Sequence, residues 1–393
     1  MSTNVIQKPK QGRDPASLAP RTIQIGLDPI MTMAAIGIAI ASLVTLAGIS
    51  HAQMVRQGGY LAVGLVAMLV MSRFDYSRLR ELKWGLYVIL IATILVVLAV
   101  GKSIGGVSTR SIGISVFSFQ ASELGKVLLI VFLAAFVVDS SRKTSSRQLV
   151  ARVILLALVP TMLVITEPDL GSGLVYIAAA FAVLYIAGAD SRHLAAVLGI
   201  GIAALALVLV VGPLVGFHTY QADRLTAFLD PGSVPASQIS HALYQQQQSV
   251  IAIGAGQKFG LGAVATSTAA NFVPLNSTDF IFAALAERFG FAGAAIVLSL
   301  YALIIWRALR IVAAAKNLFG ALVAAGVVAM LAFQVFVNVG VAVDILPVTG
   351  VTLPLLSYGG SSVLTTFLAL GLLQSIHAQA RMAAGMKGRV LSF

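Results

Sequence analysis

The chain is expected to be an all-α polytopic membrane protein with about ten transmembrane helices. Hydrophobic residues make up 59% of it and charged residues only 10%, whereas roughly a quarter of the residues of a soluble domain are charged. Its apolar runs are continuous and do not alternate with polar residues, which argues against a β-barrel. Runs of about 17 to 25 residues, the length of a membrane-crossing helix, lie near residues 30–50, 59–72, 84–101, 122–139, 149–166, 170–189, 194–216, 280–306, 318–343 and 353–376.

The ends of the chain are polar. Residues 1–29 are expected to form a disordered basic cytoplasmic tail, because the apolar run that follows is too long for a removable signal peptide and lacks a small-residue cleavage site. Residues 30–378 form a single transmembrane domain in this interpretation, and residues 379–393 a cytoplasmic C-terminal tail. Cysteine is absent, so no disulfide or thiolate chemistry is available.

One large extracytoplasmic loop, residues 217–279, is expected between the seventh and eighth helices. Connections longer than about 12 to 15 residues are commonly functional or disordered. This loop is not disordered by composition, because the stretch "QSVIAIGAGQKFGLG" combines an apolar run with glycines. The stretch indicates an amphipathic or re-entrant segment followed by turns.

The distribution of basic residues predicts the orientation. Nineteen Lys and Arg residues fall on one set of alternate connections, and five on the other: Arg56, Lys102, Arg110, Arg224 and Lys258. The positive-inside rule places both termini in the cytoplasm. The net charge of +12 is then explained by topology and by anionic lipid, and no nucleic-acid partner is needed.

The acidic residues point to the outer half of the protein. Eight of them fall within predicted spans or on the outer side: Glu123, Glu167, Asp169, Asp223, Asp230, Asp279, Glu287 and Asp344. A carboxylate at the centre of a membrane helix costs about 2.5 to 3.5 kcal/mol on insertion scales, so such groups usually mark a cavity or a pathway.

Three motifs near the expected outer surface each have a structural and a functional interpretation. In "FQASELGKVLL", Glu123 and Lys126 are neighbours on one helical face, either as a self-neutralising pair at the membrane surface or as the lining of a cavity. In "TEPDLGSGLVY", Asp169 suits the N-cap of a helix starting near Leu170, which explains it without a catalytic role. The stretch "DILPVTGVTLPLLSYGGSS" is either a tight loop or irregular backbone that lines a cavity.

The stretch "NSTDFIFAALAERFG" carries three charges at the start of the eighth span. Ser277 or Thr278 is expected to cap that helix, which would place Asp279 in its first turn, where the helix dipole stabilises a negative charge. Glu287 lies about 12 Å further along the axis and would line the same cavity. Arg288 projects from the opposite side to Asp279, so it is expected to pair with another helix.

These motifs, in this order, resemble those of the SEDS family (shape, elongation, division and sporulation) of bacterial cell-wall assembly. The resemblance rests on "FSFQASELGKVLLI", "TEPDLGSG", "QSVIAIGAG", "STDFIFAALAERFGF" and "LPVTGVTLPLLSYGGSS". "DRLTAFLDP" and "PVTG" are most similar to the rod-elongation branch, RodA. The sequence departs from the family pattern at Ser277, where the family usually has His, and at Arg288, where it has a second Glu.

The resemblance implies a glycosyltransferase of the bacterial cytoplasmic membrane that polymerises lipid II into glycan strands during cell-wall elongation. The implied partners are a class B penicillin-binding protein and other membrane proteins of the elongation complex. Asp279 is the candidate catalytic base and a candidate ligand for a divalent cation such as Mg²⁺ or Mn²⁺, although no dense ligand cluster demands one. The candidate substrate-binding residues are Glu123, Lys126, Arg224, Lys258, Gln248, Glu287, Asp169, Thr349, Ser357 and Ser361.

Two other classes of function fit a chain of this kind. A lipid II flippase, or a transporter of another amphiphile, would also have interrupted helices and charges within the membrane. It would need polar groups along a pathway to both faces, whereas here they concentrate on the outer half. A scaffold for wall enzymes would tolerate the loss of single carboxylates.

Overall fold

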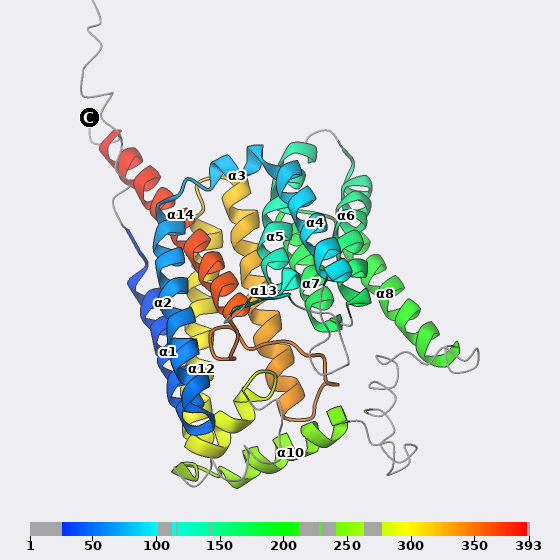
Figure 1. Cartoon of the computed structure of the whole chain (residues 1–393). Coiled ribbons are helices and arrows are strands. Elements are labelled where there is room, and N and C mark those ends of the chain that lie inside the picture. Colours follow the sequence, from blue (N-terminus) through cyan, green and yellow to red (C-terminus); the bar gives the residue numbers. More distant parts are fainter. Residues whose placement is uncertain are drawn as a thin grey trace, which may run out of the picture.

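The computed structural model describes residues 26–100, 112–114, 117–141, 144–167, 169–211, 228, 241–262 and 277–390. Within these ranges the chain is almost entirely helical (Figure 1). The helices up to the predicted large loop are α1 (Pro29–Ile49), α2 (His51–Arg73), α3 (Ser77–Glu81), α4 (Lys83–Val100), α5 (Ala121–Ser140), α6 (Ser146–Thr166), α7 (Leu170–Ile186) and α8 (Ser191–Val211). They are followed by α10 (His241–Ala255), α12 (Ile281–Ala314), α13 (Leu318–Ala342) and α14 (Gly360–Val390).

The predicted membrane-crossing segments correspond to helices of the structure. Among the described residues, eight helices are long and apolar enough to cross a bilayer, namely α1, α2, α4, α5, α6, α12, α13 and α14. The expected segments near 170–189 and 194–216 correspond to shorter apolar helices, Leu170–Ile186 and the described apolar part of α8, Ser191–Ala203. The membrane class and the all-α architecture are therefore confirmed.

The second span begins earlier than its apolar run suggests. Ser50 alone separates α1 from α2, and its side chain accepts a hydrogen bond from the Gln53 backbone N–H at 3.5 Å. A serine at this N-cap satisfies one of the donors that a helix start exposes, so α2 includes the polar residues before the apolar run.

A short hairpin precedes α5. Strands β1 (Ile112–Ile114) and β2 (Phe117–Phe119) pair antiparallel, with Ile112 opposite Phe119. Backbone groups near a membrane must find partners within the protein, and this pairing supplies them at the entrance to α5.

The helices form a bundle with a buried centre. α5, α13 and α14 bury most of their length, whereas α2 and α4 expose apolar side chains around the outside. In the bundle, α14 packs on α2, α13 on α7, and α1 on α12. Because the outer surface faces lipid, exposed residues such as Val63 and Val88 need no protein cover.

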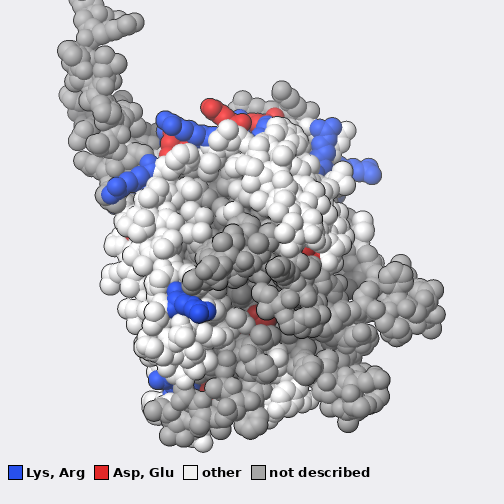
Figure 2. All heavy atoms as spheres, in the orientation of Figure 1, with Lys and Arg blue, Asp and Glu red and all other residues white. Residues whose placement is uncertain are grey.

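Charged side chains of the described residues gather at one end of the bundle. Figure 2 shows Lys and Arg, together with Asp and Glu, gathered at the end that carries α3. There Asp139 of α5 accepts hydrogen bonds from Arg80 and Lys83. Figure 1 shows α10 lying across the opposite end, transverse to the long helices. This separation agrees with the predicted orientation, in which the α3 end faces the cytoplasm.

Two of the predicted domain boundaries can be compared with helices of the structure. α10 lies inside the predicted loop 217–279, so part of that connection is helical. At the other end, α14 continues past residue 378 to Val390. Most of the predicted N-terminal tail, residues 1–25, lies outside the described residues.

A candidate active site at the outer end of the bundle

Residues 343–359, between α13 and α14, form an irregular connection that we call the closing segment. Its residues Val348, Thr349 and Leu353 to Ser357 are buried. Gln57 of α2 donates from its side chain to the Ser357 carbonyl at 3.1 Å, and Ser42 of α1 donates to the Leu356 carbonyl at 2.7 Å. This irregular backbone is therefore enclosed by protein and hydrogen-bonded, which is how such backbone is tolerated at membrane depth.

The turn that carries Asp279 is tied to the closing segment by hydrogen bonds to its carbonyls. Tyr358 N–H donates to the Ser277 carbonyl at 2.8 Å, and the Ser357 hydroxyl donates to the Thr278 carbonyl at 2.7 Å. The predicted position of Asp279 within the first turn of the helix is wrong. Residues 277–280 form a turn, and the N-cap of α12 is Phe280.

Asn338 of α13 fixes Asp279 against the closing segment. Its side-chain amide donates to the carbonyls of Asp279 and Val351, each at 2.8 Å. One amide group thus binds the backbone of two segments that are far apart in sequence. Asp279 itself is only partly buried, which suits a residue that meets a substrate from the outer aqueous side.

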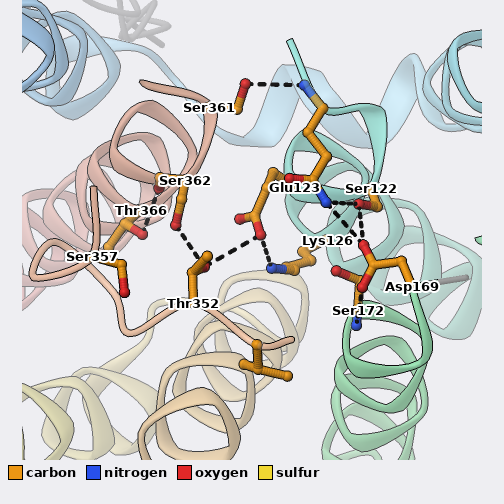
Figure 3. Close-up of polar contacts among 12 residues, drawn as sticks. Ser122, Glu123, Lys126, Asp169, Ser172, Thr352, Ser357, Ser361, Ser362 and Thr366 are labelled. Carbon is orange, nitrogen blue, oxygen red and sulfur yellow. Dashed lines mark hydrogen bonds and ion pairs between the residues drawn. The ribbon is translucent and has the colours of Figure 1, made fainter. Parts of the chain in front are cut away.

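Glu123 and Lys126 form a buried ion pair on α5. Lys126 Nζ lies 2.7 Å from Glu123 Oε1, and the two side chains are 2% and 5% exposed. These values exclude the surface-snorkelling alternative. The Thr352 hydroxyl donates to Glu123 at 3.4 Å and lies 3.0 Å from the Ser362 hydroxyl (Figure 3). Thr352 adjoins Val351, and Asn338 binds the carbonyls of both Val351 and Asp279. The buried pair and the Asp279 turn are therefore linked through the same stretch of the closing segment.

Asp169 is both a helix cap and a cross-link. One carboxylate oxygen accepts from Ser172 N–H at 3.1 Å, which confirms the predicted N-cap of α7. The other accepts from the Ser122 hydroxyl at 2.7 Å and from the Gln120 side chain at 2.9 Å (Figure 3). The Ser361 hydroxyl accepts from Gln120 N–H at 3.1 Å. Both oxygens of this buried carboxylate are satisfied, as its burial requires.

The remaining predicted residues are placed less centrally. Glu287 is buried on α12, and Thr349 is buried in the closing segment. Gln248 is partly buried on α10, and Lys258 is exposed in the turn after that helix. Arg224 lies outside the described residues. The residues described in the structure contain no group of three or more His, Cys, Asp or Glu side chains that could hold a metal ion.

Several residues of the site were not predicted. Gln120, Ser122 and Thr352 have short polar side chains that are common in loops and helix ends. Asn338 had a usable signal, because it lies four residues after Gln334 within an apolar span. Buried amides in transmembrane helices commonly hydrogen-bond to neighbouring segments.

Replacing Asn338 by Leu is expected to destabilise the fold by about 1–3 kcal/mol, because the buried hydrogen bond to Val351 and the partly buried one to Asp279 lose their donor. Gln334→Leu is the matched control, since Gln334 Oε1 is buried without a hydrogen-bond partner in the described structure. Thermal unfolding of the purified proteins in detergent measures the difference. Equal midpoints for the two variants would contradict the role of Asn338.

Comparisons with known proteins agree with this architecture. The family model FTSW_RODA_SPOVE, described as "Cell cycle protein", matches residues 22–382. Peptidoglycan glycosyltransferase MrdB of Escherichia coli (strain K12) is 35% identical, over 91% of this chain and 95% of the relative.

Solved structures match it as well. A chain from "Structural coordination of polymerization and crosslinking by a peptidoglycan synthase complex" has a TM-score of 0.77 and 30% identity, and the match covers 91% of this chain and 99% of that chain. Rod shape determining protein RodA of Thermus thermophilus has a TM-score of 0.66 and 28% identity, with coverage of 90% and 97%. The chain therefore belongs to the FtsW, RodA and SpoVE family of cell cycle proteins, the SEDS family, as a RodA-like multi-pass protein of the bacterial cytoplasmic membrane.

Proposed function

We propose that this protein is a peptidoglycan glycosyltransferase that polymerises lipid II on the outer face of the membrane during cell-wall elongation. Relatives that match most of its length are named peptidoglycan glycosyltransferases. The observation that carries the proposal is the set of hydrogen bonds joining the turn of Asp279 to the closing segment, which also contacts the buried pair Glu123 and Lys126. A partly exposed carboxylate is thereby held at a fixed position on the outer side.

In the proposed reaction, Asp279 accepts a proton from the attacking sugar hydroxyl of one lipid-linked chain. The hydroxyl oxygen forms a bond to the anomeric carbon of the other, and the bond from that carbon to the lipid pyrophosphate breaks, so the pyrophosphate carries away the electron pair. A positioned general base of this kind contributes about 10²- to 10⁴-fold to a rate. The lipid tail of each substrate stays in the bilayer while its sugars reach Asp279 from the outer side.

The departing pyrophosphate gains negative charge, which cations in a water-poor site stabilise. The charge of Lys126 is already neutralised by Glu123 at 2.7 Å. We therefore assign the Glu123–Lys126 ion pair a role in maintaining the shape of the site. We propose Arg224 for the pyrophosphate, because a guanidinium binds phosphate oxygens through two parallel hydrogen bonds. A divalent cation at Asp279 would supply further charge neutralisation.

A class B penicillin-binding protein is the proposed partner, since newly made strands must be cross-linked. The similar solved chain belongs to a complex described as coordinating polymerisation and cross-linking. Other elongation-complex membrane proteins would join the same assembly. The enzymes would then act in sequence on one strand.

Incubation of the purified protein with labelled lipid II tests the proposal, alone and with its penicillin-binding protein, with the products resolved by length. We expect a ladder of glycan strands. Labelled lipid II placed in the inner leaflet of proteoliposomes tests the rival activity in the same preparation. Transfer between leaflets without any ladder would reject the polymerase and support a flippase.

A further inference from the structure

The segment 241–261, which comprises α10 and the turn after it, has an unusual arrangement of polar and apolar residues; we call it the outer clamp. Gln246 donates from its side chain to the carbonyls of Val341 at 3.2 Å and Leu346 at 2.7 Å. The Ser249 hydroxyl donates to the Ala342 carbonyl at 2.8 Å. Val341 and Ala342 end α13, whose last carbonyls lack partners within the helix, and Leu346 belongs to the closing segment. These polar side chains therefore point into the protein and bind the end of α13 and the start of the closing segment.

The opposite face of the outer clamp is exposed and largely apolar, with Gln247 as a polar residue within it. Ile251 is 62% exposed and Phe259 is 83% exposed. Tyr244, Val250 and Leu261 are also exposed. A soluble surface helix has the reverse arrangement, with its apolar residues inward. Contiguous exposed apolar residues of this kind indicate an interaction surface.

Continuity with α12 indicates what covers this face. Phe291, which follows the break in α12, is 74% exposed, and Ile296 further along the same helix is 63% exposed. Both belong to a helix long and apolar enough to cross the membrane. Exposed Lys258 adjoins Phe259 in the turn. A basic residue beside exposed aromatic and aliphatic residues suits the boundary between lipid headgroups and acyl chains.

The outer clamp also enters the break in α12. Gly290 has a φ of 64°, which interrupts that helix. The N–H groups of Phe291 and Ala292, just after the break, donate to the carbonyls of Gln257 at 2.9 Å and Lys258 at 3.0 Å. Leu261 N–H donates to the Glu287 carbonyl at 2.9 Å, just before the break. The turn thus supplies partners that the interrupted helix lacks.

The contact between the turn and α12 is backbone against backbone. A Cβ atom on Gly260 would lie 2.2 Å from the Arg288 carbonyl oxygen, and one on Gly256 would lie 2.0 Å from the Ala286 carbonyl oxygen. Only glycine permits such an approach. The first part of α12, which begins two positions after Asp279, is therefore held by the outer clamp, while the closing segment holds the turn before it.

We propose that the outer clamp is a membrane-seated positioning element. Its apolar face lies in the outer leaflet, and its backbone bonds fix the first part of α12 and hence the turn of Asp279. Lys258, predicted from sequence as a substrate-binding residue, is assigned here to the lipid headgroup region. The effect on catalysis rests on the proposed function, whereas the seating in lipid and the rigidity of α12 do not.

The absence of native cysteine allows single labels to test the seating. Ile251→Cys and Phe259→Cys carry a fluorophore in bilayers that contain nitroxide-labelled lipids, and Glu81→Cys, exposed on α3 at the opposite end of the bundle, is the control. We expect strong quenching at the first two positions and weak quenching at Glu81. Weak quenching at all three would overturn the proposal, as would quenching that the penicillin-binding protein relieves, because the face would then bind protein.

Gly260→Ala tests the positioning, with Gly254→Ala as the control because nothing lies within 4 Å of a Cβ at that position. We expect faster amide hydrogen exchange at residues 281–292 in Gly260→Ala alone, together with a loss of kcat of about tenfold or more and little change in KM, as for an interaction made in the transition state. Unchanged hydrogen exchange in Gly260→Ala would contradict the positioning role of the outer clamp. If exchange becomes faster in Gly260→Ala but the wild-type protein makes no glycan, only the proposed function is rejected.

Discussion

Asp279→Asn is expected to abolish polymerisation of lipid II while leaving the fold intact. The asparagine amide fills nearly the same space but accepts no proton, so the rate falls by about 10²- to 10⁴-fold. The backbone bonds that hold the turn use the carbonyls of Ser277, Thr278 and Asp279. They do not depend on the side chain, so the variant isolates the chemistry of the carboxylate.

The length distribution of glycan products from labelled lipid II measures this effect, with thermal unfolding as the check on folding. Asp344→Asn is the matched control, because Asp344 lies in the closing segment and is exposed. Glycan ladders close to those of the wild type from Asp279→Asn would contradict the assignment of Asp279 as the general base. A loss of activity in both variants would indicate that outer negative charge in general, and no single base, is required.

Lys126→Ala is expected to destabilise the protein by about 3–5 kcal/mol, because it leaves the Glu123 carboxylate buried without its counter-charge. The pair lies at 2.7 Å with both side chains almost fully buried. Arg80→Ala is the control for losing a cation from an ion pair. Arg80 and Asp139 are 45% and 31% exposed, and such a pair contributes about 0–1 kcal/mol.

The double variant Glu123→Gln with Lys126→Met separates stability from function. It removes both charges together, and neutral replacements of similar size restore most of the stability lost in Lys126→Ala. Thermal unfolding in detergent compares the variants, and lipid II polymerisation is measured in parallel. A double variant that is as unstable as Lys126→Ala would contradict the paired-charge explanation. A stable but inactive one would assign the pair a role in the reaction.

Local sequence signals were sufficient for the spans and for two of the polar motifs. Continuous apolar runs predicted the membrane helices, since a helix that crosses lipid must satisfy its own backbone. The N-cap role of Asp169 follows from its position before Leu170 and was confirmed. The pairing of Glu123 with Lys126 follows from their spacing on one helix. Sequence alone left open whether that pair is buried, because burial depends on α5 lying at the centre of the bundle.

The start of α12 could not be predicted locally. A helix beginning at Ser277 or Thr278 would bond the carbonyls of residues 277–279 to amides four positions later. Those carbonyls instead accept from Tyr358, Ser357 and Asn338, which are between 59 and 81 positions away. Because of these long-range hydrogen bonds, the helix begins only at Ile281 and Asp279 lies in a turn.

The break at Gly290 was missed for a similar reason. The apolar run near 280–306 suggested one continuous helix, and a single glycine within a helical pattern does not by itself break it. The positive φ persists because Gln257 and Lys258 accept the bonds of Phe291 and Ala292. The expected re-entrant segment in the large loop was the only sequence feature that hinted at such a partner.

Chemical rescue of Asp279→Ala by formate, which reaches the site from the outer aqueous side, shows whether a carboxylate at this position accepts the proton. A small carboxylate that enters the space left by the aspartate would accept the proton in its place. We predict no glycan ladder without formate and a ladder that grows with formate concentration, while the wild type is unaffected. Polymerisation by Asp279→Ala at a rate close to wild type in the absence of formate would show that Asp279 is not the general base.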